Sequence, residues 1–159
     1  DFLAAVMDPA FALVARGPDG ALIGVAGFKT ETGALVDGTW RALAAHYGWF
    51  GALWRAPLLA LLDRKPRPGE LLMDGIFVAA AARGLGLGTA LLDAIKASAL
   101  ARGAHSVRLD GIDTNPRARA LYGRQGFVET RTVSLGPLRA LFGFSAATEM
   151  VWTAPGSAV

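Results

Sequence analysis

The stretch Arg83-Gly84-Leu85-Gly86-Leu87-Gly88-Thr89 joins an apolar, strand-like run at 71–78 to an amphipathic run at 91–101. A strand, a glycine-rich loop and a helix start together form a backbone anion site, because first-turn N–H groups and the helix dipole both favour phosphate. The three glycines of the stretch carry no side chain that would hold a ligand away from the backbone. The stretch therefore predicts the binding of a phosphorylated cofactor, and Arg83 adds a permanent positive charge to it.

The loop does not match the two commonest nucleotide-binding patterns. A P-loop requires a lysine before its Ser or Thr, whereas Gly88 directly precedes Thr89. The Rossmann pattern G-x-G-x-x-G fails in both frames, and residues 79–82 separate the strand-like run from the first glycine. Asp110 ends a second strand-like run, about where a ribose-binding acid would lie, but the misplaced glycines disfavour that interpretation.

A resemblance to a known family accounts for the loop better. The pattern R-x-x-G-x-G, starting at Arg83, resembles the acetyl-coenzyme A pyrophosphate loop of the GNAT acetyltransferase superfamily. Downstream, residues 115–122 match N-x-x-A-x-x-L-Y, and Gly126-Phe127 matches the G-F that follows it in the family. The matching segments cover about 71–128, with weaker similarity to about residue 152.

The patterns predict one domain over 1–159, of α/β (α+β) class. The resemblance implies a mixed, mostly antiparallel twisted sheet, flanked by helices, with a central parallel strand pair splayed at the cofactor slot. Strands are expected at 11–16, 21–28, 71–78, 105–111, 127–135 and 146–153, and helices at about 86–102 and 116–124.

Two regions depart from the usual pattern of the family. A strand and helices that normally precede the first hairpin are expected to be missing here, apart from a helix tail at 3–7. Segment 37–69 is interpreted as a helical insertion that caps the acceptor pocket or makes a subunit contact, the latter in a homodimer. Segment 71–128 is the expected cofactor-binding core.

The resemblance also assigns the cofactor residues. Gly75 lies inside an apolar strand, where glycine often marks a bulge, and the backbone after it is expected to pair with the pantetheine arm. Residues of the short helix at 116–124 and its cap complete the set. The expected cofactor contacts are Ile76, Phe77, Val78, Arg83, Gly84, Leu85, Gly86, Leu87, Gly88, Thr89, Asn115, Ala118 and Tyr122.

Three residues are candidates for proton transfer. The resemblance implies that Tyr122 protonates the departing coenzyme A thiolate, although a tyrosine on a short helix is also a routine core residue. Asp110 or Asp74 could take the proton from an ammonium substrate, and either could instead be a structural hydrogen-bond acceptor. Asn115, just before Pro116, is expected to cap the helix whether or not it contacts cofactor.

The amino-acid composition narrows the classes of protein to which the chain could belong. The chain has 159 residues, 53% of them hydrophobic, so it is large enough to bury a core. It has no cysteine, which excludes disulfides, thiolate catalysis and cysteine-based zinc sites. The net charge of +3 comes from scattered arginines, so no nucleic-acid partner is expected. No apolar run approaches membrane-spanning length and no signal peptide is visible, so a cytoplasmic protein is expected. His46 and His105 do not form a metal-binding pattern, so no metal is expected.

The predicted function is an acyl-coenzyme A N-acyltransferase that moves acetyl from acetyl-coenzyme A to a primary amine by direct attack in a ternary complex. The acceptor, a small molecule or a protein amine, cannot be read from the sequence, because fold does not fix substrate. Two alternatives stay open: a coenzyme A-binding sensor without turnover, and a nucleotide-binding α/β domain of another kind.

Overall fold

The computed structural model describes residues 8–35, 65–134, 136 and 143–156. The expected helix tail at 3–7 and the helical part of the predicted insertion lie outside them. The strands are β1 (Ala12–Arg16), β2 (Leu22–Thr30), β3 (Gly33–Ala34), β4 (Glu70–Val78), β5 (Ser106–Ile112), β6 (Val128–Ser134) and β7 (Ala146–Thr153). The helices are η1 (Pro9–Phe11), η2 (Ala80–Ala82), α3 (Leu87–Ala101) and α4 (Pro116–Arg124).

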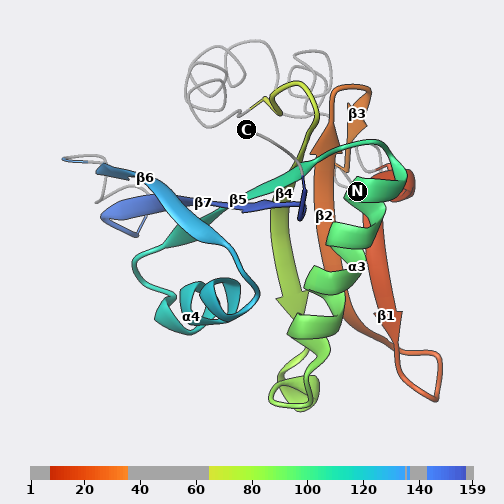
Figure 1. Cartoon of the computed structure of the whole chain (residues 1–159). Helices are drawn as coiled ribbons and strands as arrows, with labels where there is room; N and C mark the ends of the chain where they lie inside the picture. Colours follow the sequence, from red (N-terminus) through yellow and green to blue (C-terminus); the bar gives the residue numbers. More distant parts are fainter. Residues whose placement is uncertain (1–7, 36–64, 135, 137–142, 157–159) are drawn as a thin grey trace, which may run out of the picture.

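The strands form a mixed, mostly antiparallel sheet of seven strands (Figure 1). The order is β1-β2-β4-β5-β7-β6, with the short β3 paired to β2. Among the described strands, only β4 and β5 pair in parallel; the other five strand pairs are antiparallel. The predicted fold class, a mixed sheet with a central parallel pair, is therefore confirmed.

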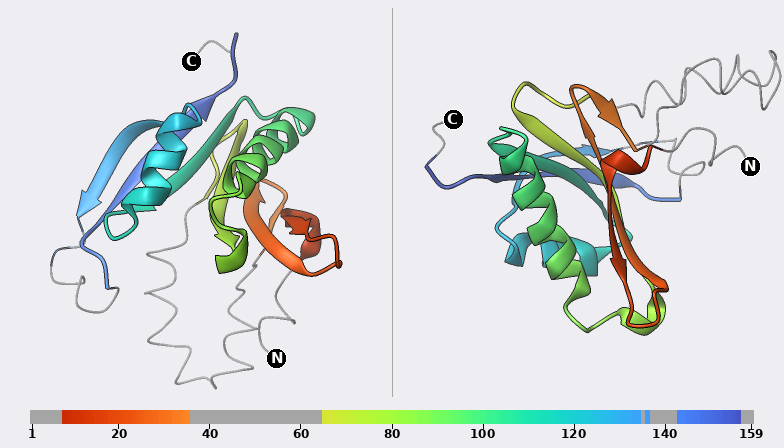
Figure 2. Two further views of the ribbon diagram at one scale, coloured as in Figure 1. Left: turned by 90° about the horizontal axis from the view of Figure 1, so that it is seen from below. Right: turned by 90° about the vertical axis from the view of Figure 1, so that its right-hand side faces the viewer.

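The core lies between the sheet and the helices α3 and α4, which pack on the same face (Figure 2). Leu92 and Ile95 of α3 are fully buried against strand residues such as Leu71 and Val107. Side chains alternate between faces along a strand, so the neighbours of Leu71 and Val107 point to the opposite face. That alternation places Glu70 and Arg108 on the face away from α3 and α4.

A glycine of β2 allows α3 to lie close to the sheet. A Cβ atom at Gly24 would stand 3.0 Å from Leu91 Cδ1 and 3.2 Å from Leu87 Cδ2, both on the first turns of α3. These separations are tighter than ordinary van der Waals contact, so a side chain at position 24 would require Leu87 and Leu91 to shift.

The register between β2 and β4 contains the bulge that Gly75 predicted. Gly27 pairs with Gly75, but the next residue, Phe28, pairs with Met73, which leaves Asp74 as the extra residue. Such a bulge bends its strand and increases the local twist. The second half of β4 is thereby turned relative to the first half.

Candidate active site

Strands β4 and β5 part after a short paired stretch, and the region between their unpaired ends is called the slot below. Their parallel pairing covers only Glu70 with Ser106, Leu71 with Val107 and Leu72 with Arg108. Past these pairs β4 continues to Val78 and β5 to Ile112, without pairing to each other. The second half of β4 is thus an internal strand edge that can accept an extended ligand by strand addition.

The hydrogen-bond pattern indicates which backbone groups face the slot. Ala79 N–H donates to Ile23 O on β2 at 2.9 Å. Antiparallel ladders bond through alternate residues, so Phe77 also turns its backbone groups towards β2, whereas Ile76 and Val78 turn theirs towards β5. Ile76 and Val78 are thus the residues that turn backbone groups towards the slot, while Phe77 is 60% exposed and its side chain lies on the face away from α3.

The loop after β4 has the geometry of an anion cradle. Gly84 and Gly86 have φ angles of +80° and +79°, which residues with a side chain rarely adopt. A Cβ atom at either position would meet no atom within 4 Å, so both backbones face open space. Arg83 Nε donates to Val78 O at 3.2 Å, which ties the start of the loop to the end of β4.

Helix α3 begins directly at this loop. Gly86 is its N-cap, and the first intrahelical bond runs from Ala90 N–H to Gly86 O at 3.1 Å. The N–H groups from Gly86 to Thr89 therefore have no partner within the helix and carry the positive end of its dipole. The sequence prediction of helix start, glycines and strand end at one place agrees with this geometry, and the residues present fit a phosphorylated ligand.

Helix α4 supplies the second group of predicted residues. Asn115 is its N-cap and accepts a hydrogen bond from Ala118 N–H at 3.2 Å through Oδ1, as the sequence predicts. Pro116 occupies the first turn, where a missing N–H costs nothing. Ala118 is partly buried and packs against the core.

Tyr122 lies in the core between α4 and the sheet. Its side chain is 6% exposed and its ring packs on Phe127, with centroids 6.2 Å apart and planes tilted by 58°. Burial raises the pKa of the Tyr122 hydroxyl above its ordinary value of 10.0. The hydroxyl is therefore protonated at neutral pH, which is the state that a proton donor needs.

The two candidate carboxylates differ in their surroundings. Asp110 lies on β5 in the part that has separated from β4, and its Oδ2 atom is buried. Asp74 is the bulge residue of β4, and its Oδ1 atom stands 3.9 Å from Lys29 Nζ. They come from the two strands that part beyond Leu72 and Arg108.

Sequence reasoning missed a buried ionic cluster beside the slot. Arg108 Nε donates to Glu70 Oε1 at 2.7 Å, and Arg108 Nη1 donates to Glu149 Oε2 at 3.3 Å. Arg67 contacts both carboxylates from the surface. The available signal was the presence of charged residues inside apolar strand runs, since such residues are almost never buried unless they are paired.

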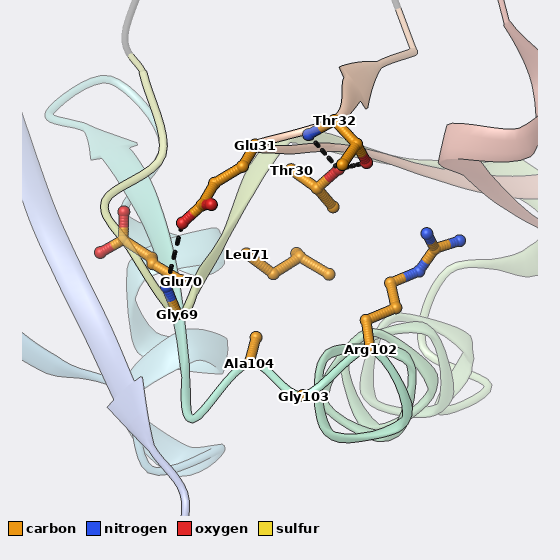
Figure 3. Close-up of a pocket in the computed structure, with 9 residues that line it drawn as sticks. All are labelled: Thr30, Glu31, Thr32, Gly69, Glu70, Leu71, Arg102, Gly103 and Ala104. Carbon is orange, nitrogen blue, oxygen red and sulfur yellow. Dashed lines mark hydrogen bonds between the residues drawn. The ribbon is translucent and has the colours of Figure 1, made fainter.

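The hollow drawn in Figure 3 lies beside the start of β4, where Glu70 and Leu71 line it, and not beside the unpaired part of β4. Its volume is about 280 Å³, and its lining includes Thr30, Arg102 and Glu31, whose Oε1 accepts from Gly69 N–H at 3.2 Å. Arg102 follows the last residue of α3, so the hollow is at the opposite end of that helix from the glycine loop. None of the residues that line it belongs to the predicted cofactor site.

Neither a metal cluster nor a membrane-spanning helix occurs in the described part of the chain. Within it, no group of three or more His, Cys, Asp or Glu side chains could hold a metal ion. Within the same ranges, no helix is long and apolar enough to cross a membrane.

Comparison with known proteins gives a clear family match. The model of the acetyltransferase (GNAT) family matches residues 3–127. A search of curated protein sequences finds no significant match.

Solved structures share the fold at low sequence identity. A GCN5-related N-acetyltransferase from Kribbella flavida is 21% identical, with a TM-score of 0.60 over 94% of this chain and 73% of that one. The ribosomal-protein-S18-alanine N-acetyltransferase from Escherichia coli is 17% identical, with a TM-score of 0.59 over 93% and 72% of the two chains. A streptothricin-type acetyltransferase from Bacillus anthracis, in complex with acetyl coenzyme A, is 16% identical, with a TM-score of 0.60 over 89% and 61%.

Proposed function

The chain belongs to the GNAT acetyltransferase family, and we propose that it transfers an acetyl group from acetyl-coenzyme A to a primary amine. The transfer occurs by direct attack of the amine while both substrates are bound. The acceptor is a small-molecule amine or an amine of a protein. Bound acetyl-coenzyme A supplies the activated acyl thioester.

One observation carries the proposal. The parallel pairing of β4 and β5 stops at Leu72 and Arg108, and the strand that continues leads into a glycine loop at a helix N-terminus. A strand edge and an anion cradle in sequence suit a ligand that has an extended amide-containing arm and a pyrophosphate. Coenzyme A has both parts in this order.

In this proposal the binding groups are mostly backbone atoms. The N–H groups from Gly86 to Thr89 bind the pyrophosphate, and the slot-facing groups of Ile76 and Val78 pair with the amides of the arm. A slot-facing N–H also stabilises negative charge that develops on the acyl oxygen during transfer. Asn115 lies at the start of α4 and contributes its side-chain amide.

Two side chains handle protons in the proposal. Tyr122 holds a proton on its Oη atom at neutral pH and donates it to the leaving sulfur. Asp110 accepts a proton from the ammonium group of the acceptor, directly or through a water, and the neutral amine that results attacks the thioester carbonyl. Asp74 is the second candidate for that role, and its proximity to Lys29 makes it the less suitable of the two.

The experiment is an acetylation screen with a thiol-specific reagent. The protein is mixed with acetyl-coenzyme A and a panel of polyamines, aminoglycosides, amino acids and peptides, and released coenzyme A is measured. Because the chain has no cysteine, the reagent reports only the coenzyme A thiol. Amine-dependent release that is reduced in Tyr122→Phe supports the proposal, whereas cofactor binding with no release for any amine would indicate a binding module.

A further inference from the structure

Arg108 connects four parts of the chain through one guanidinium group. Besides Glu70 on β4 and Glu149 on β7, it binds the backbone before β4, since Nη2 donates to Lys65 O at 2.7 Å. Arg108 itself is on β5 and only 5% exposed. A planar, forked donor is suited to such a junction, because its hydrogen bonds fix direction as well as distance.

This junction lies at the place in the sheet where β4 and β5 part. Arg108 is the last residue of β5 that pairs with β4, so it lies where the slot begins to open. Its side chain points to the face opposite α3, because Val107 and Leu109 belong to the core on the α3 side. Beyond Arg108 the described strands β4 and β5 no longer pair. Near this point, the ion pair between Arg108 and Glu70 connects the two strands through their side chains.

Stability alone is a poor explanation for a buried ion pair. Removing two charges from water is costly, and well-packed apolar residues of similar volume are often as stabilising or more so. What the hydrogen bonds do supply is a defined geometry of the side chains of Arg108, Glu70 and Glu149. Glu149 is itself held by Thr130 Oγ1 at 2.8 Å and by Arg67 Nη2 at 3.2 Å, so Arg108 is anchored on both sides.

We propose that Arg108 is a positioning residue that fixes the separation of β4 and β5 and thereby sets the affinity of the slot for the pantetheine arm. This inference rests on the proposed function. It predicts that a substitution of Arg108 does not change the affinity of the glycine loop for a pyrophosphate, because the loop is held by β4 and α3 at the other end of the slot.

The test measures the binding of two ligands to a variant that leaves no uncompensated buried charge. The variant is Arg108→Met combined with Glu70→Gln, and the amide oxygen introduced at position 70 can still accept from the backbone N–H of Arg67 as the carboxylate does. The ligands are coenzyme A and 3′-phospho-ADP, which carries the pyrophosphate without the pantetheine arm. Because small misplacements of binding groups are costly, we expect coenzyme A to bind about tenfold more weakly, with the affinity for 3′-phospho-ADP unchanged.

The matched control removes an arginine–glutamate pair that does not join β4 to β5. Arg119 Nη2 and Glu129 Oε1 are 2.6 Å apart at the surface, and Arg119→Met with Glu129→Gln should leave both affinities unchanged. Arg108→Lys, which keeps the charge but not the fork, should also weaken coenzyme A binding. In turnover, the KM for acetyl-coenzyme A should rise while kcat changes little, which distinguishes positioning from proton transfer.

Unchanged coenzyme A affinity in both Arg108 variants would overturn the inference. Equal weakening of both ligands would also overturn it, because that result indicates a general loss of structure. Failure of the wild-type protein to bind coenzyme A is a different result, and it would overturn the proposed function itself.

Discussion

Leu72 and Arg108 are the last residues that β4 and β5 hold in parallel register before the two strands part. The slot therefore arises because the parallel pairing of β4 and β5 ends, and not from the shape of a loop. The bulge at Asp74, two residues further along β4, turns the remainder of the strand. Together these features leave the backbone of Ile76 and the N–H group of Val78 beside a glycine loop, while Val78 O accepts from Arg83 Nε.

The loop assignment predicts that Gly86→Asp abolishes coenzyme A binding. The change places a side chain and a negative charge on a backbone with φ of +79°, where the pyrophosphate is expected. Gly103→Asp is a matched control, because Gly103 has φ of +78° and open space but follows the opposite end of α3. Each change should cost about 1 kcal/mol in the free energy of unfolding, measured by urea denaturation. Equal affinities for coenzyme A in the two variants would refute the loop assignment.

Tyr122→Phe should slow turnover without weakening cofactor binding. Loss of a positioned proton donor typically reduces rates by about 100-fold or more, whereas the phenyl ring preserves the packing on Phe127. The measurement is kcat alongside the Kd for coenzyme A. An unchanged kcat would return Tyr122 to a purely structural role.

The same substitution should alter stability at alkaline pH. Burial raises the pKa of Tyr122 above 10.0 in the folded state, so the folded chain retains a proton that the unfolded chain loses. Wild-type stability should therefore fall as pH rises above about 10, and Tyr122→Phe should lose less over the same range. Denaturation curves at a series of alkaline pH values on both proteins would measure this difference; parallel losses would contradict it.

Glu149 should contribute stability that acid removes. Burial opposes its ionisation, but the hydrogen bonds from Thr130 and Arg67 and the charges of Arg67 and Arg108 outweigh it and lower its pKa below the ordinary 4.5. A lowered folded pKa adds stability above the unfolded pKa, and that stability disappears as pH falls through the folded value.

Glu149→Gln should accordingly destabilise the protein at neutral pH, with the deficit shrinking below about pH 4.5. Glu129→Gln is the control, because Glu129 belongs to an exposed pair whose contribution is expected to be small. Free energies of unfolding across this pH range give the comparison. A deficit that stays constant with pH would contradict the assigned ionisation of Glu149.

Asp110→Asn and Asp74→Asn separate the two base candidates. We expect Asp110→Asn to lower kcat/KM for the amine by about 100-fold, since a positioned base contributes on that order. Asp74→Asn should have the smaller effect, because Asp74 lies beside Lys29 at the bulge. Rates across a pH series for both variants would decide the matter, and the reverse order would assign the base to Asp74.

Much of the fold could be predicted because its signals are local. The cap at Asn115 with Pro116 and the glycines before α3 each depend on a few adjacent residues. The helix at 116–124 and the last strand at 146–153 have the predicted bounds. Gly75 indicated the bulge because a glycine weakens an apolar strand and commonly occurs where its ladder is interrupted.

The rest depends on contacts between distant segments. Nothing in the sequence near Arg108 indicates that its partners are Glu70 and Glu149, which are 38 and 41 residues away. The two-residue strand β3 is too short to have a pattern of its own. Which backbone groups face the slot follows from pairing to β2, so the sequence alone could not separate Phe77 from Ile76 and Val78.

The most direct test of the account is a thermal-shift titration with acetyl-coenzyme A, with NAD and ATP in parallel. A ligand that binds only the native state adds about 2.7 kcal/mol at a hundredfold excess over Kd, which is a measurable rise in Tm for a domain of this size. The account predicts a rise with acetyl-coenzyme A and none of similar size with NAD or ATP. A rise with NAD or ATP alone, or with none of the three, would contradict it.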